Sequence, residues 1–283
     1  MLLSRKSSLA ERLRRLALWP RLAIAVTVGF LALFGIFSGF SLRAVQESTD
    51  RVLQERLVVT QMASAELDRL LGRAFYELEK ATEFASFEPS ATSQAEEVHV
   101  LAHTFGRVGS FALGVYYLDP QGRVVLSEPP GKLPPDADLS AEDHIKRARE
   151  TGRRSVSDPF VDTASGRPAV ALTIPLVRGG ILTSMLSGLI DVGSAEFTAP
   201  LQHARDLGHT GHSELVNASG RIIAGTDYGS FLQPGEHLDL YLRKLGTGGV
   251  AVENVPYIPW HPVSQGRRDE RHIMAFVPLA ERL

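Results

Sequence analysis

The sequence contains no cysteine and carries little net charge. The absence of cysteine excludes disulfide bonds, thiol nucleophiles and thiolate metal sites. It leaves the cellular compartment open, because many exported proteins also lack cysteine. The formal net charge is −2 over 283 residues, so no overall positive field would attract nucleic acid.

Short motifs of common catalytic chemistry are absent as well. The sequence has no Gly-x-Ser-x-Gly elbow, no Gly-Lys-Ser/Thr phosphate loop, no His-Glu-x-x-His pair and no Gly-x-Gly-x-x-Gly fingerprint. Three histidines, His203, His209 and His212, lie close together without the i, i+4 spacing that places two metal ligands on one helical face. We therefore expect a protein that is not an enzyme and has neither a metal site nor a cofactor.

One long apolar stretch lies near the N-terminus. The segment 22–42 carries no charged residue and is long enough, as a helix, to cross the hydrocarbon layer of a membrane. Segment 1–21 contains six Lys or Arg residues and one Glu, so the positive-inside rule places it in the cytoplasm and the rest of the chain outside. The alternative is a cleaved signal peptide, but the sequence SGFSLRA is a poor cleavage site.

Segment 43–88 is predicted to form one long stalk helix. Up to Ser86 it contains no proline and only one glycine, Gly72, and its apolar residues recur at helical spacing. Val45, Val52 and Val59 stand at heptad spacing, which favours a partner helix in a homodimer. The alternative is a stalk that packs on its own domain.

Beyond Pro89, strand and turn signals replace the helical pattern. Alternating apolar and polar residues flank the Asp-Pro-Gln-Gly turn and predict a β-hairpin over 115–129. A short helix is predicted over 138–152, where Ser140 is the N-cap candidate and Gly152 ends the helix. Further strands are predicted at 155–158, 168–177 and 181–192. Antiparallel strands with one short helix make a compact α+β module.

The same module occurs a second time. VYYLDPQGRVVLS aligns with SELVNASGRIIAG, so that Asp119 and Asn217 stand 98 positions apart, as do Gly122 and Gly220. Elements in the same order at nearly constant offset indicate an internal repeat. Pro175-Leu176 of the first module matches Pro278-Leu279 of the second. In the first module one more strand follows this pair, and a strand at the same distance in the second module would end beyond Leu283. We therefore expect an incomplete second sheet, and a chain that is a fragment of a longer protein.

These features together resemble the double Cache (dCache) sensor regions of bacterial transmembrane receptors. The matching residues, over 43–283, are YLDPQGRVVLS, DLSAEDHIKRARETGRRSVSDPFVDTASGRPAVALTIPLV, GLIDV and GHTGHSELVNASGRIIAGTD. The resemblance implies two tandem PAS-like modules, attached to a histidine kinase, chemoreceptor or cyclic-nucleotide enzyme. The implied domains are 1–21 (cytoplasmic), 22–42 (transmembrane helix), 43–88 (stalk helix), 89–192 (membrane-distal module) and 193–283 (membrane-proximal module, truncated before an output domain).

In this family the distal module binds a small extracellular ligand between the short helix and the sheet. The resemblance implies contacts from Tyr117, Glu142, His144, Arg147, Phe160, Asp162 and Asp191. Glu142 replaces the arginine that holds a ligand carboxylate in the family. The carboxylates of Asp162 and Asp191 remain and can meet an ammonium group. The resemblance therefore favours an amine or another cation as ligand.

Each carboxylate also has a structural interpretation. Asp191 ends an apolar run, where burial is costly without a partner; that partner is either a ligand or a loop N–H. Asp162 is either a ligand contact or a turn cap, and Asp158 is interpreted as a structural corner before Pro159.

We therefore predict a sensor region in the cell membrane, single-pass within this chain and with extracytoplasmic modules. A ligand with different affinity for two arrangements of the stalk helix would pass a signal through the membrane helix. The alternative is a membrane-tethered solute-binding or adhesion module without signalling output. An output domain in frame after Leu283 would distinguish the two.

Overall fold

The computed structural model describes residues 18–84, 94–109, 112–203, 212–226, 228–235, 237–247, 250–256 and 271–279. By its internal contacts the chain divides into two compact units, Met1–Gln54 and Glu55–Leu283. The helix α2 (Leu18–Phe84) begins in the first unit and ends in the second. The predicted end of the stalk at residue 88 lies outside the described residues.

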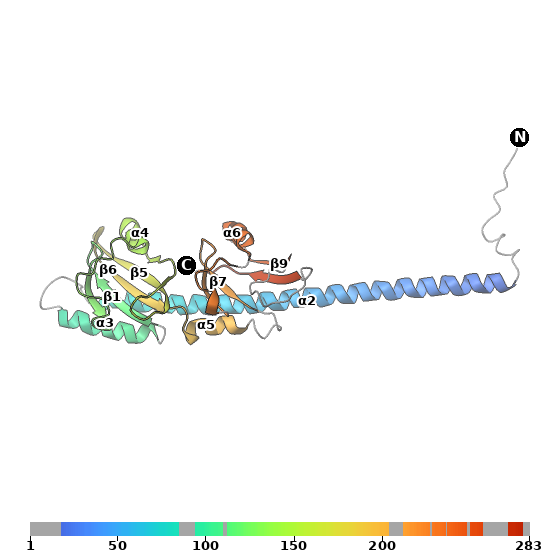
Figure 1. Cartoon of the computed structure of the whole chain (residues 1–283), viewed down its shortest axis with the longest axis horizontal. Helices are drawn as coiled ribbons and strands as arrows, with labels where there is room; N and C mark the ends of the chain where they lie inside the picture. Colours follow the sequence, from blue (N-terminus) through green and yellow to red (C-terminus); the bar gives the residue numbers. More distant parts are fainter. Residues whose placement is uncertain are drawn as a thin grey trace, which may run out of the picture. The chain divides into compact units, whose positions relative to one another are not determined.

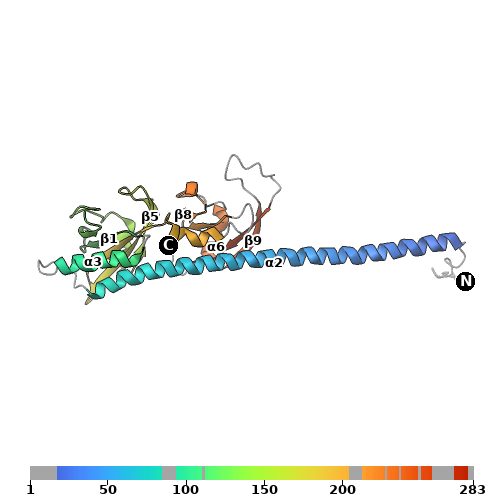
Figure 2. The ribbon, with the colours of Figure 1, turned by 90° about the horizontal axis from the view of Figure 1, so that it is seen from below.

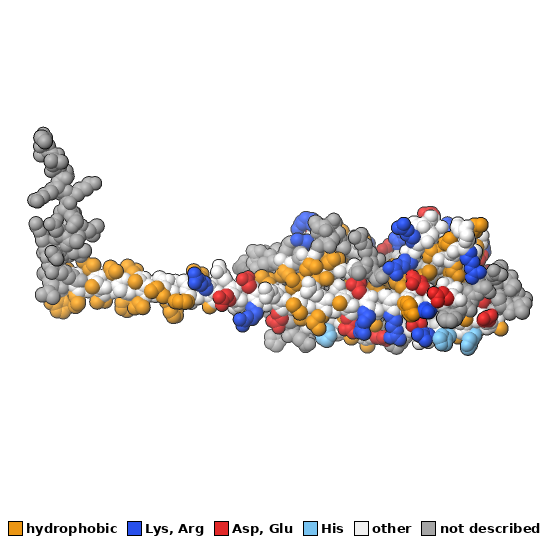
Figure 3. Space-filling view, turned by 180° about the vertical axis from the view of Figure 1, so that it is seen from behind, with side chains coloured by type: hydrophobic (Ala, Val, Ile, Leu, Met, Phe, Trp, Pro, Cys, Tyr) orange, Lys and Arg blue, Asp and Glu red, His pale blue; other side chains and the backbone are white. Residues whose placement is uncertain are grey.

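In the first unit, α2 exposes apolar side chains. Trp19, Phe30 and Phe37 are 83%, 73% and 74% exposed, and Figure 3 shows hydrophobic side chains covering this part of the helix. An 18-residue window has a mean hydropathy of 2.2 and none of it is buried. Within the described residues this is the one helix long and apolar enough to cross a membrane, a test that a signal sequence also passes.

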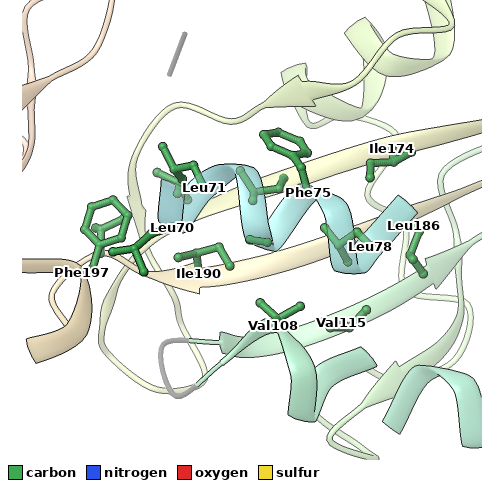
Figure 4. Packing of buried hydrophobic residues seen from close by; sticks show 14 of the residues in the cluster. Leu70, Leu71, Phe75, Leu78, Val108, Val115, Ile174, Leu186, Ile190 and Phe197 are labelled. Carbon is green, nitrogen blue, oxygen red and sulfur yellow. The ribbon is translucent and has the colours of Figure 1, made fainter. Parts of the chain in front are cut away.

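In the second unit, α2 acquires a buried face. Leu67, Leu71, Ala74 and Leu78 are each at most 2% exposed and recur at the three- and four-residue spacing of one helical face. They pack, together with Phe75, against strands of the same unit (Figure 4). This part of the helix therefore packs on its own domain, which is the alternative that the sequence left open.

A six-stranded antiparallel sheet forms the centre of the second unit. Its order is β2-β1-β6-β5-β3, with β4 paired to β5. The strands are β1 (Ala112–Leu118), β2 (Val124–Glu128), β3 (Ser155–Val156), β4 (Phe160–Val161), β5 (Pro168–Arg178) and β6 (Ile181–Asp191). The predicted hairpin and the long strands after it are confirmed.

Helices cover both faces of this sheet (Figure 1). Helix α2 packs on one, here called the α2 face, where the core includes Val115, Leu172 and Leu186. Helix α4 (Asp143–Thr151) covers the other, here called the α4 face, where Ile145 and Ala148 meet apolar strand residues. Because successive strand residues point to opposite faces, β1, β5 and β6 contribute to both cores.

Helix α3 (Gln94–Val108) was not predicted from the sequence. It lies beside the C-terminal end of α2 (Figure 2) and contributes Leu101 and Val108 to the same core. The Arg107 guanidinium donates to both carboxylate oxygens of the buried Glu77 at 2.7 and 3.1 Å. This bidentate pair, the strong form of a charged hydrogen bond, joins α3 to α2.

The rest of the second unit contains shorter elements. Its four described strands form two antiparallel pairs, β7 with β8 and β9 with β10. The elements are α5 (Ala195–Gln202), β7 (Glu214–Val216), β8 (Ile222–Gly225), η2 (Tyr228–Ser230), α6 (Leu238–Thr247), β9 (Ala251–Pro256) and β10 (Arg271–Phe276).

The sequence repeat is also a repeat of local structure. Asp119 Oδ1 accepts two backbone N–H groups at 2.9 Å after β1, and Asn217 Oδ1 accepts two at 3.1 and 2.9 Å after β7. The glycines three residues later, Gly122 and Gly220, have φ of 95° and 75°, values that residues with a side chain rarely adopt. The two turns are therefore built by residues at equivalent positions in the same roles.

Candidate functional site

Helix α4 turns one face toward the sheet. His144, Ile145 and Ala148 are its buried residues, at the spacing of one helical face. Glu142 stands at the N-cap position with an exposed side chain that caps nothing, and Gly152 ends the helix with φ of 61°. The predicted N-cap at Ser140 is therefore wrong by two residues, while the helix and its stop are confirmed.

The sheet beneath α4 carries a buried polar pair. Thr173 of β5 and Ser187 of β6 face each other in the register, and their hydroxyl oxygens are 3.0 Å apart. They are 0% and 2% exposed. Hydrogen bonding to each other satisfies both groups in a place that water does not reach.

Tyr116 is the next residue across, because β1 places it opposite Ser187. A Cβ at position 114 would lie 2.8 Å from the Tyr116 hydroxyl, so Gly114 leaves room for the tyrosine ring to extend along its own strand. Burial, and secondarily the negative charge of Asp162, raises the pKa of Tyr116 above its ordinary value. Tyr116 is therefore a neutral phenol on the α4 face.

The structure places Tyr117 on the opposite face. Its side chain belongs to the core that contains the α2 residues, so the expectation that it faces the short helix is wrong in placement. The cause is strand parity: two adjacent tyrosines point to opposite faces, and a shift of one residue exchanges them. Tyr116 takes the position expected for Tyr117.

His144 is the buried polar residue that α4 itself contributes. It is 5% exposed, and its imidazole forms no hydrogen bond to another described residue. Burial, aided by the positive charge of Arg147, lowers the pKa of His144 to about 4. The ring is therefore neutral at physiological pH and retains one donor and one acceptor.

Asp162 is held by its own loop and by a lysine. Its Oδ2 accepts from the backbone N–H and the hydroxyl of Ser165, and Lys132 Nζ lies 3.1 Å away. Burial opposes ionisation, but the hydrogen bonds from Ser165 and Lys132 outweigh it and lower the pKa of Asp162. The turn-cap alternative for this residue is thus observed.

Asp191 has an equivalent pair of partners. Its Oδ1 accepts the Gly193 N–H at 2.9 Å, and its Oδ2 lies 2.9 Å from Arg167 Nη1. The loop N–H that the sequence left as an alternative is therefore present. Asp191 is on the α4 face, since it shares strand parity with Met185 and Leu189.

The other three expected residues are at the surface. Glu142 and Arg147 are exposed, and Arg147 donates to the Val156 carbonyl. Phe160 is 36% exposed on β4. The structure thus brings His144, Asp162 and Asp191 to the buried α4 face, and leaves Glu142, Arg147 and Phe160 outside it. Among the described residues, no group of His, Asp or Glu could hold a metal ion, and His209 lies outside them.

Comparison with known proteins gives a match at the level of structure. No family model matches the sequence, and no curated protein matches it. The ligand-binding domain of the Pseudomonas fluorescens chemoreceptor CtaA, in complex with L-alanine, matches with a TM-score of 0.58 at 17% identity, over 83% of this chain and 92% of that one. The Pseudomonas aeruginosa PAO1 amino-acid chemoreceptor PctB, in complex with L-Gln, matches with a TM-score of 0.53 at 16% identity, over 78% and 82%.

The fold is that of dCache-type ligand-binding domains of bacterial chemoreceptors. An extracellular ligand-binding receptor from Desulfohalobium retbaense DSM5692 also matches, with a TM-score of 0.53 at 15% identity over 70% of this chain. This chain spans 35% of that receptor's length. The chemoreceptor structures are of ligand-binding domains, and at these identities the match shows the fold.

Sequence reasoning missed the cations of this site. Lys132 and Arg167 pair with the two acidic residues, yet each stands in a turn segment where a basic residue normally faces water. Arg167 is indeed 61% exposed, whereas the Lys132 side chain is 9% exposed, and no sequence pattern distinguishes the two. Tyr116 was missed for a different reason, because the apolar run of β1 has no alternation from which its facing could be read.

Proposed function

We propose that this chain is the membrane-anchored, extracytoplasmic sensor region of a receptor, which binds a small ligand on the α4 face. The observation that carries the proposal is the imidazole of His144, which is 5% exposed and forms no hydrogen bond to another described residue, while its ring nitrogens stay accessible to solvent. A small ligand that enters from solvent can therefore reach these nitrogens, which offer it one donor and one acceptor. The fold is shared with chemoreceptor ligand-binding domains whose structures hold L-alanine (CtaA), L-Gln (PctB) or GABA (PctC of Pseudomonas aeruginosa PAO1).

The site is centred on His144 and Tyr116, with the Thr173–Ser187 pair as its floor. Asp162 and Asp191 form its walls, and Glu142, Arg147 and Phe160 lie at its rim. Both carboxylates already have partners inside the chain, so the neutral groups make the first contacts with the ligand. Tyr117 acts from the opposite face, as part of the core that supports β1.

The organisation proposed here has two tandem modules, with the α4-bearing module distal to the membrane and the β7–β10 region proximal to it. The apolar part of α2 crosses the membrane, with segment 1–21 in the cytoplasm. A homodimer through the exposed Val45 and Val52 positions would transmit a change in α2 packing.

The test is a thermal-shift screen of the full chain in detergent micelles against amino acids, amines, carboxylates and polyols. We expect at least one compound to raise the melting temperature, since binding to the native state alone stabilises it. His144→Ala should abolish that rise, whereas His103→Ala, at an exposed position of α3, should keep it. A rise that survives His144→Ala unchanged would place the ligand elsewhere.

A further inference from the structure

Lys132 is a buried lysine in a connecting segment. It belongs to the chain between β2 and α4, and its side chain is 9% exposed, as is that of Asp162. Lysine is almost never buried to this degree unless it is paired. The contacts of its ammonium group therefore indicate what this part of the molecule is built to hold.

The ammonium group meets two acceptors that the fold holds in place. Lys132 Nζ donates to the Leu113 carbonyl of β1 at 2.6 Å and lies 3.1 Å from Asp162 Oδ2. Asp162 is fixed in turn by the N–H and hydroxyl of Ser165. A carboxylate and a strand carbonyl aimed at one point are the acceptors with which a protein would bind the amino group of a small ligand.

The second carboxylate of the α4 face is also paired, but with a cation whose side chain is 61% exposed. Asp191 is paired with Arg167 and with the Gly193 N–H. A ligand ammonium would have to displace a lysine or an arginine that is tethered to the chain and therefore present at a high effective concentration. Both acidic side chains therefore already have a cation of the chain beside them, and the one beside Asp162 is itself buried.

We propose that Lys132 is the resident occupant of an ammonium subsite formed by Asp162 and the Leu113 carbonyl, so that the ligand of the α4 face carries no ammonium group. The statement about the ligand rests on the proposed function, whereas the assignment of Lys132 to the ammonium subsite does not. The inference reverses the expectation of an amine or cation. It separates this site chemically from a site for L-alanine or GABA, both of which carry an amino group.

Chemical rescue tests the subsite directly. Lys132→Ala in the full chain removes three methylenes and the ammonium, which n-propylammonium replaces. We expect the variant to melt at a lower temperature than the parent, and n-propylammonium to recover a large part of the loss. The parent chain and the Lys132→Ala/Asp162→Asn variant should not respond, and 1-propanol, which has the same length without the charge, should not rescue.

If Lys132→Ala is recovered only as aggregate, refolding is carried out with n-propylammonium or with 1-propanol. Soluble, folded protein with the amine alone supports the proposal. No recovery with either compound, or equal recovery with both, overturns it. A folded variant whose melting temperature does not respond to n-propylammonium overturns it as well.

The ligand class is tested on the parent chain with L-alanine and GABA. We expect neither to raise the melting temperature. A rise with either compound that is lost in Asp162→Asn would overturn the proposal, because Asp162 would then bind a ligand ammonium. Failure of the proposed sensor function would give a different result. No compound of the screen would then bind, but n-propylammonium would still rescue Lys132→Ala.

Discussion

The side-chain amide of Asn217 donates to Asp158 Oδ1 at 3.0 Å and so joins the two copies of the sequence repeat. Asn217 also holds its own turn, because its Oδ1 accepts from the backbone of Ser219 and Arg221. Its counterpart Asp119 holds an equivalent turn with a carboxylate. An amide can accept on one side and donate to a carboxylate on the other, whereas an ionised carboxylate only accepts, so aspartate could not form this link in the second copy.

The first prediction concerns this link. Asn217→Asp keeps the turn acceptor but sets one carboxylate against another, so we expect a loss of about 1–3 kcal/mol of unfolding free energy. Asp119→Asn, the matched change in the first copy, should lose less because no carboxylate faces it. Thermal or denaturant melting measures both. Asp158→Asn added to Asn217→Asp should restore stability, and a double variant no better than Asn217→Asp would show that the two side chains are not coupled.

The second prediction concerns the packing of α2 on the sheet. Leu78 is 0% exposed and lies against Gly188 of β6, so Leu78→Ala should lose about 2–5 kcal/mol. Met62, on the same helix, is 65% exposed, and Met62→Ala is the control. Melting curves that shift equally for the two variants would contradict the packing of this half of the helix on its own unit.

The third prediction concerns pH. Because the pKa of His144 is about 4 in the folded chain and about 6.5 when unfolded, the unfolded chain binds more protons between these values. The contribution of His144 to the unfolding free energy is therefore complete above about pH 6.5. As the pH falls toward 4, the unfolding free energy decreases by an amount on the order of 3 kcal/mol. Asp162, whose pKa is also lowered, adds a further loss in stronger acid. In His144→Gln the melting temperature should change little between pH 6.5 and 4.5. If the variant loses stability over this range as steeply as the parent chain, other groups cause the pH dependence.

The fourth prediction concerns topology. The natural sequence has no cysteine, so Ala164→Cys, at an exposed loop position, creates a single labelling site. A membrane-impermeant maleimide should label it on intact cells. Labelling that appears only after permeabilisation would place the α4-bearing region in the cytoplasm.

A structural feature could be predicted from the sequence when it is determined by residues that are close together in the chain. The hairpin at Asp119, the helix stopped at Gly152 and the repeated turn at Asn217 are determined by a few adjacent residues, and the structure confirms them. Which face of the sheet Tyr116 and Tyr117 point to depends on the register of a buried strand, and an apolar run does not reveal that register.

The partners of the acidic residues could not be predicted either. Lys132 is 30 residues from Asp162, and Arg167 is 24 residues from Asp191. Such pairs form only after the sheet and its connecting segments are in place. The sequence indicates that an acidic residue at the end of an apolar strand requires a partner. Only the tertiary structure shows whether that partner comes from the chain or from a ligand.

Hydrogen–deuterium exchange of the full chain, with and without the compound that raises its melting temperature, tests the ligand site most directly. We expect slower exchange in α4 and in the facing parts of β5 and β6, with little direct change in β7 and β8. The protection should disappear in His144→Ala and persist in His103→Ala. Protection confined to the β7–β10 region, with α4 unaffected, would contradict the claim that the α4 face binds the ligand.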